Sequence, residues 1–434
     1  MTPINIYKQH ALNKTMAKAG DTVEIKTKKA TYKGTLLPRP ELLSQDTTVL
    51  KLESGYNIGI ATKTIENIKV IEKYKKKEKP KQKLSKNKNL PNVAILSVGG
   101  TIASRVDYIT GGVYADYQAS DFIAMCPELE KAANIKAVNV MKVMSEDILP
   151  QDWAKIARAV AKTLQNVEGV VITHGTDTMH YTSAALSFLL EGLDKPVILT
   201  GAQRSIDRPS SDAFMNLACA VHAASKLKHA GVAICMHAES SDTYCNLIPG
   251  VKARKMHTSR RDAFRPMGVD PLARVWPEGR IEHISTKKPP ENKKLKVNSC
   301  KSEISLIEIH PSIDPSIITK QLGKVRGMII AATALGHVPL NNPKSLETAL
   351  KKACKKIPVF ICSQTLYGRV HPHVYASLRK LSMDIGATFL EDMLPETALA
   401  KLSVALTKKN PKKYMTENIA GEITEREKYH TFLQ

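Results

Sequence analysis

The sequence predicts an α/β protein whose two-domain core of parallel sheets follows a small all-β domain at the N-terminus. Two observations carry this prediction. Short strands with period-two patterning fill the first seventy or so residues, and from Pro91 onward unbroken apolar runs alternate with helical segments. The chain has 434 residues, of which 43% are hydrophobic. A single domain usually has roughly 100–200 residues, so we expect two or three domains.

Residues 1–72 are predicted to form the small β domain. The segment GDTVEIKT alternates apolar and polar side chains from Val23 to Ile25, and ATYKGTLLP follows it. After a turn at Pro38-Arg39-Pro40 come TTVLKLESGYNIGIA and IENIKVIEKY. Short alternating strands between Gly and Pro turns are typical of a small barrel or an open sandwich.

Residues 73–90 form a lysine-rich linker, KYKKKEKPKQKLSKNKNL, because so few apolar side chains cannot offset the entropy of ordering the chain. The whole chain carries 64 Lys and Arg against 41 Asp and Glu, a formal net charge of +23. Such an excess attracts polyanions, and nucleic acid is the first candidate. A surface that is simply rich in lysine is the other interpretation, and charge alone does not decide between them.

The core is predicted to have a large α/β domain over residues 91–286 and a smaller one over 303–410. Buried-type strands are expected at NVAILSVGG, GVVITHG, KPVILTGAQ and GVAICM, with helices from Asp152 to Gln165 and from Met179 to a C-terminal Gly192. Continuous Val and Ile runs between helices indicate a parallel sheet covered on both faces. A polar linker over 287–302 precedes the strands SLIEIH, RGMIIAAT and IPVFICSQT, and residues 411–434 form a polar tail.

Cysteine usage and hydropathy set the expected compartment. The seven cysteines are scattered singly, without a C-x-x-C pair, which argues against a disulfide framework and against a zinc site. We therefore expect no metal and no cofactor in this chain. The sequence MTPINIYKQH has no apolar signal region, and no stretch approaches the ~20 apolar residues that span a bilayer. The expected location is the cytoplasm, without membrane contact.

Three segments with polar side chains stand out. The first two lie at the ends of predicted strands, and the third lies in a turn-rich stretch. They are Gly99-Gly100-Thr101-Ile102-Ala103-Ser104, Thr173-His174-Gly175-Thr176-Asp177-Thr178-Met179 and Ala253-Arg254-Lys255-Met256-His257-Thr258. In a parallel sheet, ligands bind in the crevice beyond the carboxyl ends of strands. Each segment also has an ordinary structural interpretation: a glycine turn, a helix cap at Asp177 or Thr178, and a solvated lysine. Their combination favours a catalytic site, and none of them is a nucleotide phosphate loop.

The three segments together supply the groups for nucleophilic catalysis. A threonine hydroxyl is a poor nucleophile and needs an adjacent base. A lysine can be that base when its surroundings lower its pKa, with a carboxylate to orient it. Thr, Lys and Asp can then act as Ser, His and Asp do elsewhere, and the glycine turn and the helix entrance can supply N–H donors for an oxyanion.

The segments GGTIAS and THGTDTM resemble the two signatures of the L-asparaginase/glutaminase family, and the spacing from Lys255 to Asp262-Ala263-Phe264 resembles its catalytic-lysine segment. The resemblance covers roughly residues 91–410 and implies two α/β domains. It also implies an active site completed by a neighbouring protomer, and hence a homodimer. It implies that Thr101 attacks the amide carbon, while Thr176, Asp177 and Lys255 form a second triad.

The same resemblance implies the substrate contacts. Ser145 and Glu146 match the positions that hold the substrate's α-carboxylate and α-amino group, although the family often has Gln where this chain has Glu146. Gly100 and Gly175 complete the expected substrate contacts. The family's mobile-loop tyrosine corresponds to Tyr108 or Tyr114 in RVDYITGGVYADYQ, whose glycines suit a lid.

The N-terminal segments GDTVEIKTKKATYKGTLLP and VLKLESGYNIGI resemble the leading domain of the D-type glutaminase component of the archaeal glutamyl-tRNA(Gln) amidotransferases. This resemblance implies a glutaminase that passes ammonia to a tRNA-binding E-type component in a heterodimer or heterotetramer. The E-type component then uses ATP with magnesium to convert Glu-tRNA(Gln) to Gln-tRNA(Gln).

Two other functions are open to a sequence of this kind. A stand-alone cytosolic L-asparaginase would hydrolyse free asparagine without a partner, but such an enzyme lacks residues 1–90. A catalytically silent tRNA-binding module would have no reason to keep Thr101, Thr176, Asp177 and Lys255 together. The sequence leaves four questions open. They are whether glutamine or asparagine is preferred, which threonine attacks first, which route ammonia takes, and whether the linker contacts tRNA.

Overall fold

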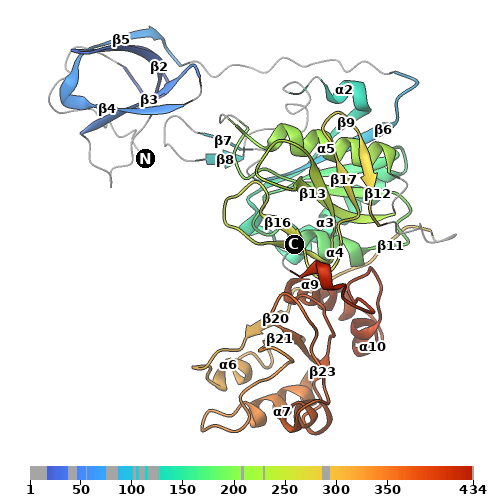
Figure 1. The fold of residues 1–434 in the computed structure, drawn as a ribbon. Coiled ribbons are helices and arrows are strands. Elements are labelled where there is room, and N and C mark those ends of the chain that lie inside the picture. Colours follow the sequence, from blue (N-terminus) through green and yellow to red (C-terminus); the bar gives the residue numbers. More distant parts are fainter. Residues whose placement is uncertain are drawn as a thin grey trace.

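The computed structural model describes residues 17–37, 46–54, 56–74, 87–100, 126, 128–206, 210–227, 230–285 and 294–432, together with the backbone of 104–106 and 113–115. Figure 1 shows a small sheet near the N-terminus, a large α/β unit and a smaller α/β unit that carries the C-terminal part of the chain. No helix within these described residues has the length and apolar character needed to cross a bilayer.

The N-terminal unit is a five-stranded antiparallel sheet with the order β4-β3-β2-β1-β5. Its strands are β1 (Thr22–Thr27), β2 (Thr31–Leu37), β3 (Thr47–Leu52), β4 (Asn57–Ala61) and β5 (Ile65–Glu72). Alternate side chains such as Val23 and Ile25 point into a small apolar core, which accounts for the period-two pattern. The prediction of an all-β N-terminal domain is confirmed.

The large unit contains an eight-stranded sheet with the order β18-β17-β14-β13-β12-β10-β6-β9. Five strands are parallel: β9 (Asn134–Val143), β6 (Asn92–Gly99), β10 (Gly169–Thr173), β12 (Pro196–Thr200) and β13 (Gly231–His237). At one edge β14 (Cys245–Pro249), β17 (Ala273–Val275) and β18 (Ile281–His283) run antiparallel. The predicted parallel sheet is confirmed. The sequence did not indicate its antiparallel edge, which forms because the seven residues between β13 and β14 are too few for a crossover helix.

Helices cover both faces of this sheet. On one face lie α2 (Leu129–Ala132) and α5 (Ala213–Lys226), whose Leu217 and Val221 pack against the sheet. On the other lie α3 (Pro150–Leu164) and α4 (Met179–Leu189), with Trp153 and Leu186 in a second apolar cluster. The predicted helices are therefore present. The predicted end of α4 is not at Gly192, because Leu190–Glu191 form a short strand, β11, paired with β19 (Lys296–Val297).

The small unit is a four-stranded parallel sheet of β20 (Ile304–Glu308), β21 (Gly327–Ala332), β22 (Val359–Ser363) and β23 (Thr388–Phe389). Around it lie α6 (Ser316–Thr319), α7 (Glu347–Lys356), α8 (Ala376–Arg379) and α9 (Pro395–Ala405). Helix α9 belongs to both units, because its Leu402 packs in the small core while Ala400 and Val404 pack in the large one.

Buried ion pairs accompany this junction. In the large unit, Lys252 Nζ lies 2.7 Å from Asp392 Oδ2 of the small unit. On α9, Lys401 Nζ lies 2.5 Å from Glu422 Oε1, and both side chains are fully buried. Glu422 belongs to the segment that we expected to be a polar tail, which begins with α10 (Pro411–Thr416). The tail therefore folds back onto the protein, because its carboxylate is the partner of a buried lysine.

Candidate active site

The carboxyl ends of three neighbouring parallel strands meet at one edge of the large sheet. The register pairs Thr173 of β10 with Ser97 of β6 on one side and with Thr200 of β12 on the other. The chain therefore leaves all three strands at nearly the same level. This edge is where open α/β sheets bind ligands, and it brings together Gly99-Gly100, residues 174–178 and residues 201–203.

The first two of these loops touch through glycine backbone. Gly100 has φ +78°, and a Cβ built on it would lie 2.1 Å from the Cα of Gly175. A Cβ on Gly175 would lie 2.7 Å from Cβ and Oγ of Ser145. Glycine is required at both positions, since no side chain fits between the two loops. The residue before Thr101 is thus in contact with the residue before Thr176, with Ser145 beside them.

Thr176, Asp177 and Lys255 form a hydrogen-bonded group at this edge. Lys255 Nζ donates to Thr176 Oγ1 over 2.9 Å and to Asp177 Oδ1 over 2.6 Å. The Lys255 side chain is 10% exposed and that of Asp177 is 63% exposed. The amine therefore lies between a buried hydroxyl and a carboxylate that reaches solvent. The structure brings together these three predicted residues from segments 78 residues apart.

Lys255 is fixed by the strand that carries it. The sequence indicated a turn-rich segment, but Ala253–Lys255 form β15, which pairs with β16 (Phe264–Pro266) so that Lys255 lies opposite Phe264. The same strand is tied to α9 by an ion pair between Arg254 and Glu396. Short strands beside a long loop are hard to detect from sequence, because three residues show too little periodicity.

Two buried histidines flank the threonine loop, and both are held neutral. Desolvation in the protein interior lowers the pKa of His174 to about 4. Desolvation, together with the nearby cations Arg254 and Lys255, lowers the pKa of His180 to about 3. Neither ring adds positive charge near Lys255 at neutral pH. The imidazoles behind the threonine loop are therefore uncharged at neutral pH.

The helix-cap interpretation of this loop does not hold for Thr178. This residue occupies the N-cap position of α4 but makes no side-chain capping bond. Its hydroxyl donates instead to the carbonyl of Ser145 over 2.5 Å. That bond fixes the 3-10 turn Ser145–Asp147, in which Ser145 is buried and Glu146 is exposed.

Part of the predicted site falls outside the described residues. Thr101 and Tyr108 both lie there, so their predicted roles rest on the sequence. Tyr114 lies in β8 (Val113–Ala115), which pairs with β7 (Ser104–Val106) so that Tyr114 faces Arg105 in register. The choice between the two tyrosines stays a prediction.

Sequence reasoning missed one residue that touches the site. Gln203 follows β12, and its Oε1 lies 3.4 Å from Thr176 Oγ1. The signal was available, because KPVILTGAQ ends on the same sheet edge as the two threonine segments. Within the part of the chain that the structure describes, no three His, Cys, Asp or Glu side chains gather as a metal site would require.

Family comparisons agree with the geometry. Residues 92–289 match the family described as "Asparaginase, N-terminal", and residues 303–418 match "Glutaminase/Asparaginase C-terminal domain". The structure is similar to the thermostable L-asparaginase from Thermococcus kodakarensis, with a TM-score of 0.70 and 28% identity over 77% of this chain and all of that one. L-asparaginase I from Vibrio cholerae gives a TM-score of 0.66 and 29% identity over 77% of this chain and 99% of that one. Fold and site define an amidohydrolase of the asparaginase type.

The N-terminal domain shows which family of asparaginase-type amidohydrolases the chain resembles. Residues 17–71 match the "GatD N-terminal domain". The D-type component of glutamyl-tRNA(Gln) amidotransferase from Pyrococcus furiosus is 46% identical over 415 residues, 93% of this chain and 94% of that one. The same component from Methanococcus maripaludis is 41% identical over 94% of this chain and 98% of that one. The chain belongs to the family of D-type components of the glutamyl-tRNA(Gln) amidotransferases. These components are the glutaminases of the amidotransferases.

Proposed function

We propose that this chain hydrolyses the side-chain amide of glutamine and supplies the ammonia to a tRNA-dependent amidation. The position of Lys255 Nζ between Thr176 Oγ1 and Asp177 Oδ1 carries this proposal. A lysine held by a carboxylate and a hydroxyl can exchange protons with the reacting groups. The close relatives named above are components of amidotransferases, which supports glutamine as the amide donor.

In the proposed chemistry, Thr101 Oγ1 attacks the amide carbon of glutamine and loses its proton to a neighbouring base. The C–N bond then breaks, and the nitrogen takes up a proton and leaves as ammonia. Water cleaves the resulting ester on Thr101, which releases glutamate and restores the hydroxyl. Thr176, Asp177 and Lys255 move these protons. Support for Thr101 as the nucleophile comes from Gly100, which packs on the loop of this triad.

The substrate contacts are also part of the proposal. Buried Ser145 and exposed Glu146 hold the α-carboxylate and α-amino group of glutamine, and Asp177 shares the α-amino contact. Gly100 and Gly175 let the chain backbone approach the substrate, and Tyr108 belongs to the lid. A carboxylate at position 146 attracts an ammonium more strongly than an amide does.

Membership of an amidotransferase implies at least one partner protein. We propose that the partner is the E-type component in a heterodimer or heterotetramer, that the asparaginase core forms a homodimer, and that the assembly acts on Glu-tRNA(Gln) in the cytoplasm. ATP and magnesium are then used by the E-type component. The net charge of +23 favours contact with tRNA.

Replacement of Thr101 by Ala tests the donor role. In the complex with the E-type component, Thr101→Ala should abolish ammonia release from glutamine while tRNA amidation from added ammonium chloride continues. Glutamine hydrolysis that survives in this variant would remove Thr101 as nucleophile. Loss of amidation from both nitrogen sources would show that the substitution damages the assembly.

Deletion of residues 1–86 distinguishes the proposed tRNA-dependent function from that of a stand-alone asparaginase. The solved asparaginases match about three quarters of this chain over their full length, so the core has what it needs to fold. The truncated chain should still hydrolyse free glutamine. It should lose most of its ability to support glutamine-dependent amidation of tRNA. Equal loss of both activities would mean that the β domain supports the core itself.

A further inference from the structure

The loop that carries Gln203 is held by a buried carboxylate at the start of α5. Asp212 is fully buried, and its two oxygens accept the backbone N–H groups of Gln203 and Arg204, each over 3.0 Å. Asn216, one turn further along the helix, donates to Asp212 Oδ2 over 3.1 Å and to the carbonyl of Gly201 over 2.9 Å. Asp212 and Asn216 therefore fix the first residues of the loop after β12, from Gly201 to Arg204.

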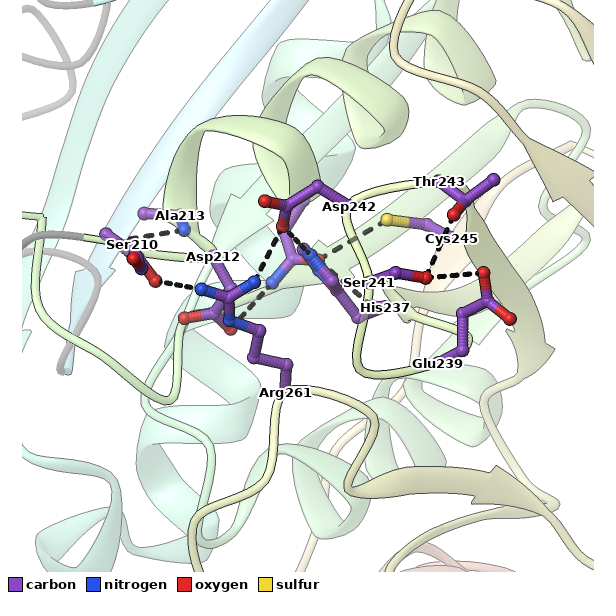
Figure 2. Close-up of polar contacts among 12 residues, drawn as sticks. Ser210, Asp212, Ala213, His237, Glu239, Ser241, Asp242, Thr243, Cys245 and Arg261 are labelled. Carbon is purple, nitrogen blue, oxygen red and sulfur yellow. Dashed lines mark hydrogen bonds and ion pairs between the residues drawn. The ribbon is translucent and has the colours of Figure 1, made fainter.

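The same hydrogen bonds continue to the hairpin that carries Lys255. Asn216 Oδ1 accepts the backbone N–H of His237 over 3.0 Å and lies 2.6 Å from His237 Nδ1. On the other side of the ring, His237 Nε2 lies 3.0 Å from Asp242 Oδ1. Arg261 Nη1 donates to the same Asp242 oxygen over 2.8 Å (Figure 2). Arg261 belongs to the loop between β15 and β16, a few residues after Lys255.

We call this series, Arg261, Asp242, His237, Asn216, Asp212 and Gln203, the buried network. Its central members His237, Asn216 and Asp212 are fully buried, and each is satisfied by its neighbours in the series. Polar groups without partners in an interior are costly, so such a network has few alternative arrangements. It joins the loop that touches Thr176 to the loop that follows Lys255.

The position of Gln203 matters because of the single proton on the Thr176 hydroxyl. Lys255 Nζ donates to Thr176 Oγ1, so the hydroxyl proton must point to another acceptor. Gln203 Oε1 is that acceptor at 3.4 Å, a long bond of the kind that tightens when substrate binds. A hydroxyl between one donor and one acceptor has a defined rotamer and a defined direction for its proton.

We propose that Gln203 is a positioning residue for Thr176, and that the buried network sets its place relative to Lys255. The inference rests on the proposed glutaminase function and adds a residue to it. Gln203 orients the hydroxyl and does not hold the substrate. Its loss therefore lowers the rate of the chemical step and leaves glutamine binding nearly unchanged.

Gln203→Met tests the acceptor, because methionine keeps the length of the side chain and removes its oxygen. With the full chain in complex with the E-type component, kcat for glutamine should fall about tenfold or more, while KM stays within about twofold. The melting temperature should match that of Gln165→Met, the same change at an exposed position after α3. Gln203→Glu restores an oxygen acceptor and should recover most of the lost kcat.

Asp242→Asn tests the network at its exposed end, where folding tolerates change because the Asp242 side chain is 64% exposed. We expect a fall in kcat of about threefold without a change in KM. Glu239→Gln is the matched control. Glu239 lies in the same loop and accepts from Ser241, in a cluster that is separate from the buried network in Figure 2. That variant should keep the parental kcat.

Three results would overturn the inference. They are an unchanged kcat in Gln203→Met, a loss that appears equally in Gln165→Met, and a Gln203→Met defect that lies in KM alone. If the proposed glutaminase function itself is wrong, the result differs from all three, because the unmodified complex would then release no ammonia from glutamine.

Discussion

At the scale of single residues, the site shows how burial sets the charge state of side chains behind the reacting groups. His174 and His180 are neutral because their surroundings exclude water, and Arg254 and Lys255 reinforce this for His180. The two rings therefore add no positive charge to that of Arg254 and Lys255, and the carboxylate paired with Lys255 is that of solvent-facing Asp177. A protonated imidazole next to the lysine would compete for the same acceptors.

The two histidines predict a specific dependence of stability on pH. In the unfolded chain each imidazole takes up a proton near pH 6.5, whereas in the folded protein His174 stays neutral to about pH 4 and His180 to about pH 3. The stability that these two neutral histidines allow is therefore fully present above pH 6.5. It is lost as the pH falls, because the unfolded chain then binds protons that the folded protein does not. Between pH 6.5 and its folded-state pKa, each histidine should add up to about 1.4 kcal/mol per pH unit to the slope of the unfolding free energy.

Urea unfolding between pH 7.5 and 5 measures that slope. His180→Phe keeps a ring in the apolar space beside Phe264 and should flatten the slope by the amount due to one proton. His373→Asn, at an exposed position, should leave it unchanged. A slope in His180→Phe equal to that of the parent would contradict the neutral state of His180.

Single residues also show which parts of the site could be predicted from the sequence and which could not. Thr176, Asp177 and Lys255 were predicted because hydroxyl, carboxylate and amine suit nucleophilic catalysis, and because their segments resemble the signatures of the asparaginase/glutaminase family. Gln203 and Asp212 were not, because an amide or a buried carboxylate in a helical segment has no pattern until its partners are known. The pairing of Lys252 with Asp392 was equally invisible, since the two are 140 residues apart.

At the scale of elements, the contact between two loops is the most demanding feature of the site. Gly100 and Gly175 approach so closely that the loops after β6 and β10 have no room for a side chain between them. The sequence indicated a turn at each place but not their contact. Strand order decides that contact, and the order β6-β10-β12 follows from tertiary packing.

Gly100→Ala should therefore damage the site more than an ordinary glycine replacement. The new Cβ would lie 2.1 Å from the backbone of Gly175, so one loop must move. We expect glutamine hydrolysis to fall by about a hundredfold or more, with a loss of roughly 1–3 kcal/mol in unfolding free energy. Gly386→Ala is the control, because Gly386 has φ +89° and no described atom within 4 Å of its Cβ position. Equal activity in the two variants would contradict the loop contact.

The elements also show which strands the sequence did not predict within the correctly predicted fold. Unbroken apolar runs predicted four of the five parallel strands, β6, β10, β12 and β13. The fifth, β9, was missed because polar residues interrupt its sequence and most of its residues are only partly buried. The antiparallel edge of β14, β17 and β18 was missed, because these strands have three to five residues and carry polar positions such as Asn246 and Arg274. Period and hydrophobicity do not distinguish such segments from loops.

At the scale of the whole molecule, the two α/β units are joined by charge as well as by apolar packing. Burial lowers the pKa of Lys252, while Asp392 beside it raises it, so the ammonium depends on its partner. Asp392 in turn accepts the backbone N–H of Thr424 over 3.0 Å. The large unit, the small unit and the folded-back tail therefore meet at one carboxylate.

Lys252→Met leaves that carboxylate buried without its cation, and should lower the unfolding free energy by about 3–5 kcal/mol. The double variant Lys252→Met/Asp392→Asn should recover part of this loss. Lys351→Met removes one partner of a partly exposed pair with Glu347 and should cost no more than about 0.5 kcal/mol. Guanidinium unfolding of the three variants checks the order, and equal losses for Lys252→Met and Lys351→Met would contradict it.

The separation of Lys252 and Asp392 along the chain has a consequence for biosynthesis. A ribosome that has completed the eight-stranded sheet has still to make more than a hundred residues before it adds the counter-ion of a lysine at the centre of the junction. Until then the nascent large unit carries an unpaired ammonium at Lys252, in the turn directly before the strand that carries Lys255. We therefore expect the strand that carries Lys255 to become fixed late in translation, when the small unit docks and supplies the partners of Lys252 and Arg254.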